Sequence, residues 1–341
     1  REKMIEELVN TLGLNRPATA MNILSISSDR KVFEEGSAVR SRLVEYGSLA
    51  GELHVIVFAK RSLGFCNEAI STNIFLYPTN SLSRFFHVPF AIIRAFALKR
   101  RGVSIDVVTT QDPFECGLAG FFIARSFGAR LHIQIHTDFM NPYFAHESVI
   151  NRARVILAKF LIPRADAIRV VSERIKNSLS NVKCQMSKVY VLPIFVETRA
   201  VRTSSKHDLK KKYPQFDFCA LIVARLASEK NIGSAIEAFD SVIKKYPKTG
   251  LVIVGSGPEE KRLKKLVAQL GLEKNIIFEG WQDNLFSYYK TADILVFPSL
   301  YEGYGMVAVE ALCAGCPVIM TDVGCAGDIV RDRENGFVVP V

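Results

Sequence analysis

The sequence of 341 residues has no apolar run that is long enough to cross a membrane. A membrane-spanning helix needs roughly 18 or more apolar residues in a row. The nearest stretch, from Phe85 to Leu98, is interrupted by His87 and Arg94. Cysteine occurs seven times, an odd number scattered through apolar segments, which does not fit a disulfide framework. The sequence therefore favours a cytoplasmic protein with reduced thiols.

Two of these cysteines, Cys313 and Cys316, have the CxxC spacing of metal and redox sites, and Cys325 lies nearby. Cys313 falls in an apolar helical pattern, Cys316 precedes Pro317 at the start of a predicted strand, and no second pair of ligands follows at the usual spacing. We interpret these cysteines as thiols in or near a core, and we expect no metal site.

An acidic surplus is also missing, because the formal net charge is +10. Residues 1 to 200 hold 26 Lys and Arg against 17 Asp and Glu, whereas residues 201 to 341 hold 18 against 17, so the basic surplus belongs to the first half. Such a field favours a phospholipid surface, an acidic glycan or nucleic acid, although a soluble protein also carries one without any partner. No recognisable nucleic-acid motif accompanies the charge, so we expect no nucleic-acid partner.

Short apolar segments alternate with helical patterns from about residue 21 onward. The predicted strands of the first half are Met21 to Ile26, His54 to Phe58, Asn73 to Leu76, Val103 to Val108, Leu131 to Ile135 and Ala167 to Val171. Helical patterns cover about residues 38 to 50, 82 to 99, 116 to 126, 148 to 162 and 173 to 180. This alternation is typical of a mostly parallel sheet with helices on both faces.

The alternation breaks near Leu192-Pro193 and in the charged stretch from Arg199 to Lys212, and then it restarts. The strands predicted there are Cys219 to Val223, Leu251 to Val254, Asn275 to Phe278, Ile294 to Phe297, Val318 to Thr321 and Gly336 to Val339. We therefore predict an α/β protein with two doubly wound parallel-sheet domains, residues 21–195 and 196–341, after an N-terminal extension at residues 1–20. Ligands of such sheets bind at the carboxyl ends of the strands, so we expect the domains to face each other across a cleft.

The chain stops at Val341, directly after a predicted strand, and it begins at Arg1. A parallel α/β domain normally continues with a helix that covers the last strand. We therefore expect the C-terminal end to be truncated.

Two loops that follow predicted strands of the second domain have features of a phosphate site. The first carries Arg225 and Lys230 just before a helix, which suits a diphosphate because Arg offers a planar fork and Lys a point charge. The second has Gly255 and Gly257, which would let a phosphate or a nucleoside approach the backbone. Position 260 is Glu260, so G-x-G-x-x-G is incomplete, which counts against a dinucleotide-binding oxidoreductase.

A third loop carries Glu302, Gly303 and Gly305 to a helix that begins near Met306. The unpaired N–H groups of a first helical turn and the helix dipole favour an anion. Glu302 and Glu310 bracket this site, and a carboxylate beside a phosphate suggests a nucleotide whose ribose hydroxyls donate to the acid. A helix N-terminus with an acidic cap and no ligand explains the same residues.

Taken in order, these motifs resemble the nucleotide-sugar half of a retaining glycosyltransferase of family 4, with the GT-B architecture (glycosyl transferases group 1). The residues that carry the resemblance are Arg225-x4-Lys230, Gly255-x-Gly257-Pro258-Glu259, Gly280-Trp281, Ala292-Asp293 to Pro298-Ser299, Glu302-x7-Glu310, Gly315-Cys316-Pro317-Val318 and Asn335-Gly336. The resemblance covers nearly the whole second domain. The first domain matches more loosely, through its alternation and through His136.

The resemblance implies a role for each matching residue. Arg225 and Lys230 would hold the donor diphosphate and stabilise the leaving group, and Glu302 would face the donor sugar. His136 would touch that sugar near the reacting carbon. The implied donor-binding residues are Gly36, Gly257, Trp281, Gly303, Tyr304, Gly305, Met306, Val307 and Glu310, the last on the ribose. Near Gly36 the family often has two glycines, where this chain has Glu35.

The implied reaction develops negative charge on the departing diphosphate, which fixed cations and helix amides stabilise. We therefore expect no magnesium and no cofactor besides the donor substrate, a UDP or GDP sugar. Retention would follow from front-face attack, which we hypothesise, or from a covalent intermediate on a carboxylate, for which Asp138 and Glu302 are the candidates.

The acceptor is expected to be a glycan or lipid-linked molecule of cell-envelope polysaccharide biosynthesis. Basic residues alternate with aromatic and aliphatic ones in Arg84 to Arg101 and Arg152 to Leu161, as in helices that lie on an anionic membrane surface. Packed helices with solvated basic faces explain the pattern equally well. A nucleotide-sugar epimerase of the same architecture and a nucleotide-sugar-binding protein without turnover remain the alternatives. We expect a cytoplasmic enzyme, peripheral on the cytoplasmic membrane face.

Overall fold

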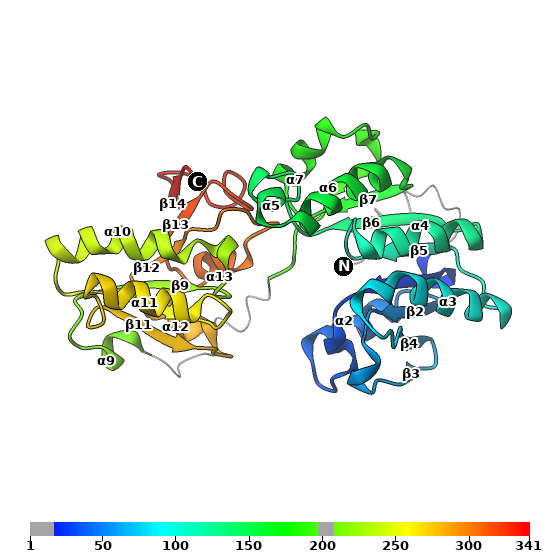
Figure 1. Ribbon diagram of the computed structural model, residues 1–341, viewed down its shortest axis with the longest axis horizontal. Helices are drawn as coiled ribbons and strands as arrows, with labels where there is room; N and C mark the ends of the chain where they lie inside the picture. Colours follow the sequence, from blue (N-terminus) through cyan, green and yellow to red (C-terminus); the bar gives the residue numbers. More distant parts are fainter. Residues whose placement is uncertain (1–16, 197–207) are drawn as a thin grey trace. The chain divides into compact units, whose positions relative to one another are not determined.

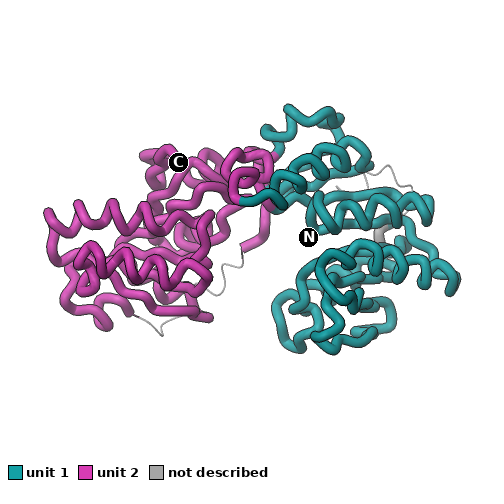
Figure 2. The backbone as a smooth tube through the Cα atoms, viewed as in Figure 1, with its two compact units in different colours: residues 1–136, 148–171, 176–192 teal, residues 137–147, 172–175, 193–341 magenta. Residues whose placement is uncertain are grey.

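The computed structural model describes residues 17–196 and 208–341. Most of the predicted N-terminal extension, and the start of the charged stretch after the predicted domain boundary, lie outside the described residues. The chain divides into two compact units (Figure 2). Unit 1 comprises residues 1–136, 148–171 and 176–192, and unit 2 comprises residues 137–147, 172–175 and 193–341. Two short segments of the first half of the chain therefore belong to unit 2.

Unit 1 is built on a sheet with the strand order β3-β4-β2-β1-β5-β6-β7-β8 in its described residues. The strands are β1 (Asn22–Ser27), β2 (Glu52–Val57), β3 (Glu68–Ser71), β4 (Ile74–Pro78), β5 (Val107–Thr110), β6 (Arg130–Ile135), β7 (Ala167–Val170) and β8 (Val189–Val191). The helices that follow them are α2 (Ala38–Gly47), α3 (His87–Arg100), α4 (Glu115–Phe127), α6 (Val149–Leu161) and α7 (Glu173–Ser178). β3 pairs antiparallel with β4, and the other neighbours pair in parallel.

The two faces of this sheet differ in polarity. In Figure 1, α3, α4 and α6 lie side by side over one face, and α4 packs against both of its neighbours. Apolar residues of the central strands, such as Leu24, Ile133 and Val170, are fully buried. The residues that alternate with them on β5 and β6 include Thr109, His132 and Gln134. Unit 1 thus places titratable and polar side chains on the second face of its sheet.

Unit 2 is built on a sheet with the order β11-β10-β9-β12-β13-β14, and its described neighbours pair in parallel. The strands are β9 (Phe218–Val223), β10 (Thr249–Val254), β11 (Ile276–Gly280), β12 (Ile294–Phe297), β13 (Val318–Thr321) and β14 (Gly336–Val339). The helices are α5 (Pro142–Glu147), α9 (Leu209–Lys212), α10 (Ile232–Lys245), α11 (Glu260–Leu270), α12 (Leu285–Thr291) and α13 (Met306–Cys313). The chain order reverses between β9 and β12, so the loops after these two strands leave the sheet beside each other.

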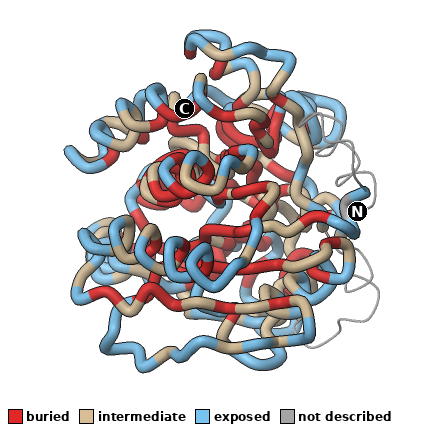
Figure 3. Tube along the Cα trace, turned by 90° about the vertical axis from the view of Figure 1, so that its right-hand side faces the viewer, coloured by how far each residue is buried: buried red, intermediate tan, exposed pale blue. Residues whose placement is uncertain are grey.

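Burial follows the pattern that the sequence predicts. The apolar stripe of α10, which includes Ile232, Ile236 and Phe239, packs with Leu251 and Ile253 of β10 in one core. Figure 3 shows buried segments of the chain in the interior and exposed segments at the periphery. The two doubly wound parallel sheets are confirmed. Differences are local: β5 begins at Val107 rather than Val103, and β3, β8, α5, α9, α11 and α12 have no counterpart among the predicted elements.

Candidate active site

The loops after β9 and β10 interlock through their backbones. The Leu226 N–H donates to the Ser256 carbonyl at 3.0 Å, and the Leu226 carbonyl accepts from the Glu259 N–H at 2.9 Å. A Cβ at Gly257 would lie 2.3 Å from the Leu226 carbonyl oxygen, and one at Gly255 would lie 1.9 Å from the carbonyl oxygen of the residue after β9. Real Cβ contacts are not that short, so glycine is required at both positions by packing alone. The donor-binding role of Gly257 stays a prediction.

The two cations of the β9 loop each pair with a carboxylate. Arg225 Nη2 donates to Glu229 Oε1 at 2.5 Å, and the Arg225 side chain is 68% exposed whereas that of Glu229 is 8% exposed. Lys230 Nζ donates to Glu302 Oε1 at 2.5 Å, with both side chains largely buried. The same Glu302 oxygen accepts from Ser299 Oγ at 2.8 Å. Lys230 and Glu302, which are 72 positions apart in the sequence, are thus brought together.

The loop after β12 presents its backbone N–H groups at the start of α13. Gly305 precedes the helix with φ +87°, a left-handed conformation that glycine adopts without strain. In the part of the chain that the structure describes, no hydrogen-bond acceptor is found for the N–H groups of Gly303, Tyr304, Gly305, Met306 and Val307. Five consecutive donors therefore remain available beside Lys230, in the arrangement that binds phosphate.

The carbonyls and N–H groups on the other side of this loop are paired. Thr321 Oγ1 donates to the Ser299 carbonyl at 2.5 Å, and the Leu300 N–H donates to the Glu229 carbonyl at 2.8 Å. Because the ends of β12 and β13 and the β9 loop share these bonds, the start of the loop is anchored to both of its neighbours.

Glu310 lies one turn into α13 and is partly buried. Its Oε2 accepts from Tyr289 Oη of α12 at 3.0 Å. Burial raises the pKa of the Glu310 carboxyl, and the Tyr289 bond opposes that rise. Burial, and then the neighbouring Glu310 charge, raises the pKa of the Tyr289 hydroxyl. A carboxylate held in one orientation by a buried tyrosine can accept from a sugar hydroxyl with its remaining lone pairs.

Trp281 follows β11 and is 69% exposed, with its Nε1 donating to Asp283 Oδ1 at 3.2 Å. The adjacent Gly280 has φ +69° and its carbonyl accepts from the Gly255 N–H at 2.7 Å. The Trp281 ring is therefore attached to the β10 loop through the backbone and is open to a flat ligand.

Unit 1 holds the other two implied site residues. Gly36 is exposed, with φ +75°, in the turn before α2, whose first turn is capped by Ser37. His136 follows the carboxyl end of β6, and burial together with the Arg169 charge lowers its pKa to about 4. Asp138, the candidate nucleophile, belongs to the segment of unit 2 that follows and is 6% exposed.

A polar network on the same face of the unit 1 sheet surrounds Arg169. Its guanidinium donates to Gln134 Oε1 at 2.9 Å and to the Leu192 carbonyl at 3.2 Å. Gln134 Nε2 donates to Thr109 Oγ1, which lies 2.8 Å from His132 Nδ1. Burial, and then the Arg169 charge, lowers the pKa of His132 to about 3. The histidines of this face are thus neutral at pH 7, and Arg169 is its permanent cation.

The described residues offer neither a metal site nor a membrane span. Among the residues that the structure describes, no group of three His, Cys, Asp or Glu could hold a metal ion. Within the same ranges, no helix is long and apolar enough to span a membrane. Cys316 and Cys325 are buried, as interpreted from the sequence, whereas Cys313 is exposed at the end of α13.

Comparisons with known proteins match both halves of the chain. The family model for "Glycosyl transferases group 1" matches residues 205–341, and that for "Glycosyltransferase Family 4" matches residues 46–200. The poly(glycerol-phosphate) alpha-glucosyltransferase of Bacillus subtilis is 37% identical over 127 residues, which are 37% of this chain and 19% of that protein. The alpha-monoglucosyldiacylglycerol synthase of Acholeplasma laidlawii is 27% identical over 309 residues, 85% of this chain and 77% of that protein.

The chain spans 62% and 55% of the length of two further relatives that it matches. A crystal structure of Anabaena HepE in complex with UDP and glucose superposes with a TM-score of 0.71 at 20% identity, covering 94% of this chain and 86% of that one. The matches to the two family models together cover nearly the whole chain, and the fold agrees with them. The chain therefore belongs to the family 4 glycosyltransferases, with the GT-B fold.

Proposed function

We propose that this protein is a retaining, metal-independent hexosyltransferase that uses a nucleoside-diphosphate sugar of UDP or GDP type and a lipid-linked or glycan acceptor. The observation that carries the proposal is the row of available N–H groups from Gly303 to Val307, beside Lys230 and one turn before Glu310. One edge of the unit 2 sheet thereby offers N–H donors for a phosphate, the Lys230 ammonium as a cation, and the Glu310 carboxylate as an acceptor for ribose hydroxyls.

The ion pairs of the site are compatible with a diphosphate ligand. An ammonium has three donors, of which Lys230 uses one on Glu302, and a guanidinium has five, of which Arg225 uses one on Glu229. The carboxylates hold the two cations in place and leave donors for the ligand. As the bond from sugar to phosphate breaks, these donors and the helix amides stabilise the charge on the departing diphosphate without a metal ion.

Retention is proposed to follow from front-face attack. Glu302 Oε1 is already engaged by Lys230 and Ser299, which lowers its nucleophilicity and suits a residue that orients sugar hydroxyls. The neutral His136 imidazole can hydrogen-bond a sugar hydroxyl without adding positive charge near the reacting carbon. A glycosyl adduct on Asp138 or Glu302, detected by mass spectrometry after quenching, would replace this route with a double displacement.

Support for the substrates comes from names of related proteins. The Anabaena structure is titled as a complex with UDP and glucose, and the Acholeplasma relative is named as an alpha-monoglucosyldiacylglycerol synthase. We propose an acceptor of cell-envelope polysaccharide biosynthesis that is presented at the cytoplasmic face of an anionic membrane.

The outer surface of α3, α4 and α6 suits such a membrane. Its exposed apolar side chains are Ile93 (61% exposed), Phe96 (45%), Phe122 (50%), Ile156 (71%) and Phe160 (45%). Residues 84–101, 115–127 and 149–164 hold five, one and four Lys or Arg and a single acid, Glu115, which pairs with Arg154 at 2.9 Å. Apolar side chains interleaved with an excess of cations over acids match the boundary between acidic headgroups and acyl chains.

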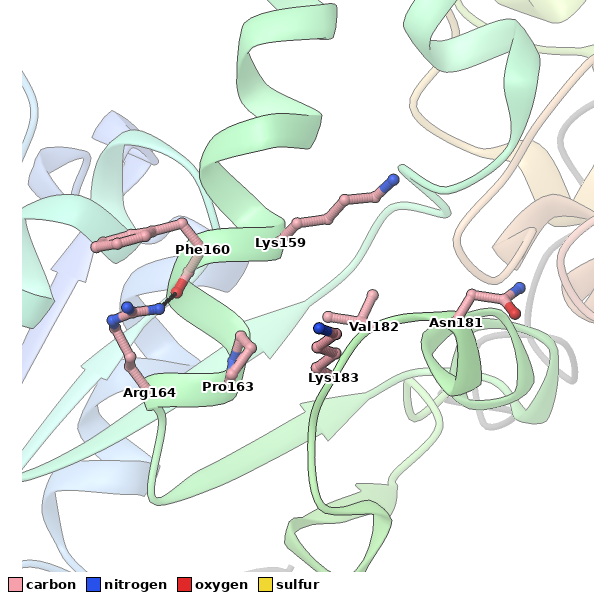
Figure 4. A pocket seen from close by; sticks show the side chains of 7 residues that line it. All are labelled: Lys159, Phe160, Pro163, Arg164, Asn181, Val182 and Lys183. Atoms are coloured by element: carbon pink, nitrogen blue, oxygen red, sulfur yellow. Dashed lines mark hydrogen bonds between the residues drawn. The ribbon is translucent and has the colours of Figure 1, made fainter.

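A pocket of about 460 Å³ adjoins the end of α6 (Figure 4). Lys159, Arg164 and Lys183 contribute cations to its wall, and Phe160 contributes an aromatic ring that the Arg164 guanidinium covers at 3.7 Å. The pocket extends the same combination of basic and apolar groups.

The first experiment is a calorimetric screen of UDP, GDP and ADP sugars, followed by turnover assays of the Glu310→Ala variant with its fold checked by circular dichroism. Binding with turnover that the variant loses supports an enzyme, and binding without turnover supports a nucleotide-sugar-binding protein. Product analysis without acceptor separates transfer from epimerisation. Membrane binding is tested by the fraction of protein that sediments with phosphatidylglycerol vesicles. This fraction should fall as the salt concentration rises, and it should be lower for the Ile156→Ser variant. The control Tyr246→Ser, which changes an exposed side chain of unit 2, should sediment like the wild type.

A further inference from the structure

Two short segments, residues 137–147 and 172–175, belong to unit 2 although they directly follow β6 and β7 of unit 1 (Figure 2). Both contact the stretch from Leu300 to Gly303, which leads into the row of available N–H groups. We call them the first brace and the second brace. Neither brace was expected from the sequence, because apart from Asp138, the candidate nucleophile, these segments carry none of the motifs of the donor site.

The first brace joins two loops through one carboxylate. Glu147, at the end of α5, accepts from Tyr301 Oη at 2.6 Å and from Ser228 Oγ at 3.4 Å. Phe144 packs edge-on against the Tyr301 ring at 5.6 Å between centroids. Burial, and then the Glu147 bond, raises the pKa of the Tyr301 hydroxyl. Ser228 begins the short helix that contains Lys230, so Glu147 holds the Lys230 loop and the Glu302 loop together.

The second brace acts on the backbone next to Glu302. Ser172, which is 2% exposed, donates its hydroxyl to the Gly303 carbonyl at 3.1 Å. Arg174 bonds to Asp322 and also donates to the Ala326 carbonyl at 3.4 Å. Arg174 thus binds the second brace to the residues that follow β13, and Ser172 binds the same brace to the loop that carries Glu302 and Gly303.

The Ser172 bond sets the direction of a ligand-facing N–H. In a trans peptide the C=O of one residue and the N–H of the next point in opposite directions. Because the Gly303 carbonyl points to Ser172, the Tyr304 N–H points away from it. Gly303 has no Cβ, so its peptide would rotate readily without this bond.

We propose that Ser172 and Glu147 are positioning residues for the donor. Ser172 aims the first N–H groups of the anion site, and Glu147 keeps Lys230 and Glu302 in register through Ser228 and Tyr301. The inference rests on the proposed function, since it assigns these residues to the binding of a nucleoside diphosphate. Neither residue is assigned a contact with the reacting atoms; both act through the loops that they hold.

The test measures UDP and GDP affinity by calorimetry and donor and acceptor KM in the full chain. Ser172→Ala should weaken nucleotide binding by about tenfold, the size of one lost hydrogen bond, and raise the donor KM equally. The acceptor KM should not change, and Ser172→Thr, which keeps the hydroxyl, should restore binding. Hydrogen exchange of the peptide that contains residues 303–307 should accelerate in Ser172→Ala. The matched control is Ser180→Ala, which removes an exposed hydroxyl that donates to a carbonyl elsewhere in the chain.

Tyr301→Phe provides a second variant whose fold is safe, because it removes one oxygen from a partly exposed side chain. It should raise the donor KM as Glu147→Gln does, and the double variant should be no worse than either single one. Variants that bind nucleotide as tightly as the wild type overturn the inference alone. A wild-type chain that binds none of the nucleotides overturns the proposed function and the inference with it.

Discussion

Replacing Lys230 with methionine removes one charge from the site and keeps most of the apolar stem. The side chains of Lys230 and Glu302 are 20% and 14% exposed, so the variant leaves the Glu302 carboxylate almost out of water, with Ser299 still donating to it. Breaking a fully buried ion pair costs about 3–5 kcal/mol, and an exposed pair is worth less than about 1 kcal/mol. We expect an intermediate loss of about 2 kcal/mol, which lowers the melting temperature of unit 2 by roughly 4–8 °C.

The same substitution should lower kcat for a different reason. If Lys230 stabilises the departing diphosphate, the loss of one preorganised donor reduces kcat by about 10²–10³. The double variant Lys230→Met, Glu302→Gln removes the stranded charge. It should recover most of the lost melting temperature and none of the lost kcat.

Calorimetric melting and donor turnover, measured on the same preparations, separate the two effects. Lys244→Met is the matched control, because Lys244 pairs with Asp240 at 2.5 Å on the surface of α10 and is 73% exposed. It should change neither quantity appreciably. A double variant that regains kcat together with its melting temperature would show that activity was lost through the fold, and would refute a role for Lys230 at the diphosphate.

Three other perturbations follow from the structure. His136 and His132 have folded pKa values of about 4 and 3, below the unfolded value near 6.5. The stability that they contribute is therefore present above pH 6.5 and is lost as the pH falls towards 4. Urea unfolding of unit 1 should show a lower stability at pH 4.5 than at pH 7, and His132→Gln should reduce this difference. In urea unfolding, Gly257→Ala should destabilise unit 2 by more than about 2 kcal/mol, because its Cβ would meet a backbone carbonyl at 2.3 Å. The control Gly233→Ala in α10, whose Cβ would have no contact under 3.5 Å, should stabilise unit 2 by about 0.5–1 kcal/mol. Glu310→Ala, which removes both acceptor oxygens, should abolish the preference for UDP over 2′-deoxy-UDP in calorimetry if this carboxylate binds the ribose, and an undiminished preference would assign the ribose to another group.

The sequence predicts the parts of the fold whose signal is local. Buried parallel strands are short apolar runs, so they were placed nearly correctly. The helix expected after Lys230 is α10, whose apolar residues recur at helical spacing. The edge strand β3 (Glu68–Ser71) is half polar and pairs antiparallel with β4, so it has no apolar run to reveal it. The helix α5 has six residues, which is too short for a periodic pattern to be recognised in the sequence. Its assignment to unit 2 depends on packing and is not encoded in any local motif.

The site shows the same division between local and distant information. The pair of Arg225 with Glu229 has the i,i+4 spacing that could have been read from the sequence. The pair of Lys230 with Glu302, the support of Glu310 by Tyr289 and the Ser172 bond to Gly303 join residues that only the fold brings together. Motif order predicts which residues belong to the candidate site, but it gives no information about which of them form ion pairs or hydrogen bonds with one another.

The ion pairs of Arg225 with Glu229 and of Lys230 with Glu302 lower the net charge of the anion site, which affects the kind of anion that the site can bind tightly. Two cations with no acid nearby would attract any phosphate, but Glu229 and Glu302 cancel most of that charge while leaving directional donors on Lys230, Arg225 and the amides after Glu302. A ligand then gains little from net charge and much from matching several fixed donors at once, as a diphosphate does and a single phosphate does not. For the proposed nucleoside-diphosphate donor, the acids beside the cations therefore favour selectivity over general affinity for anions.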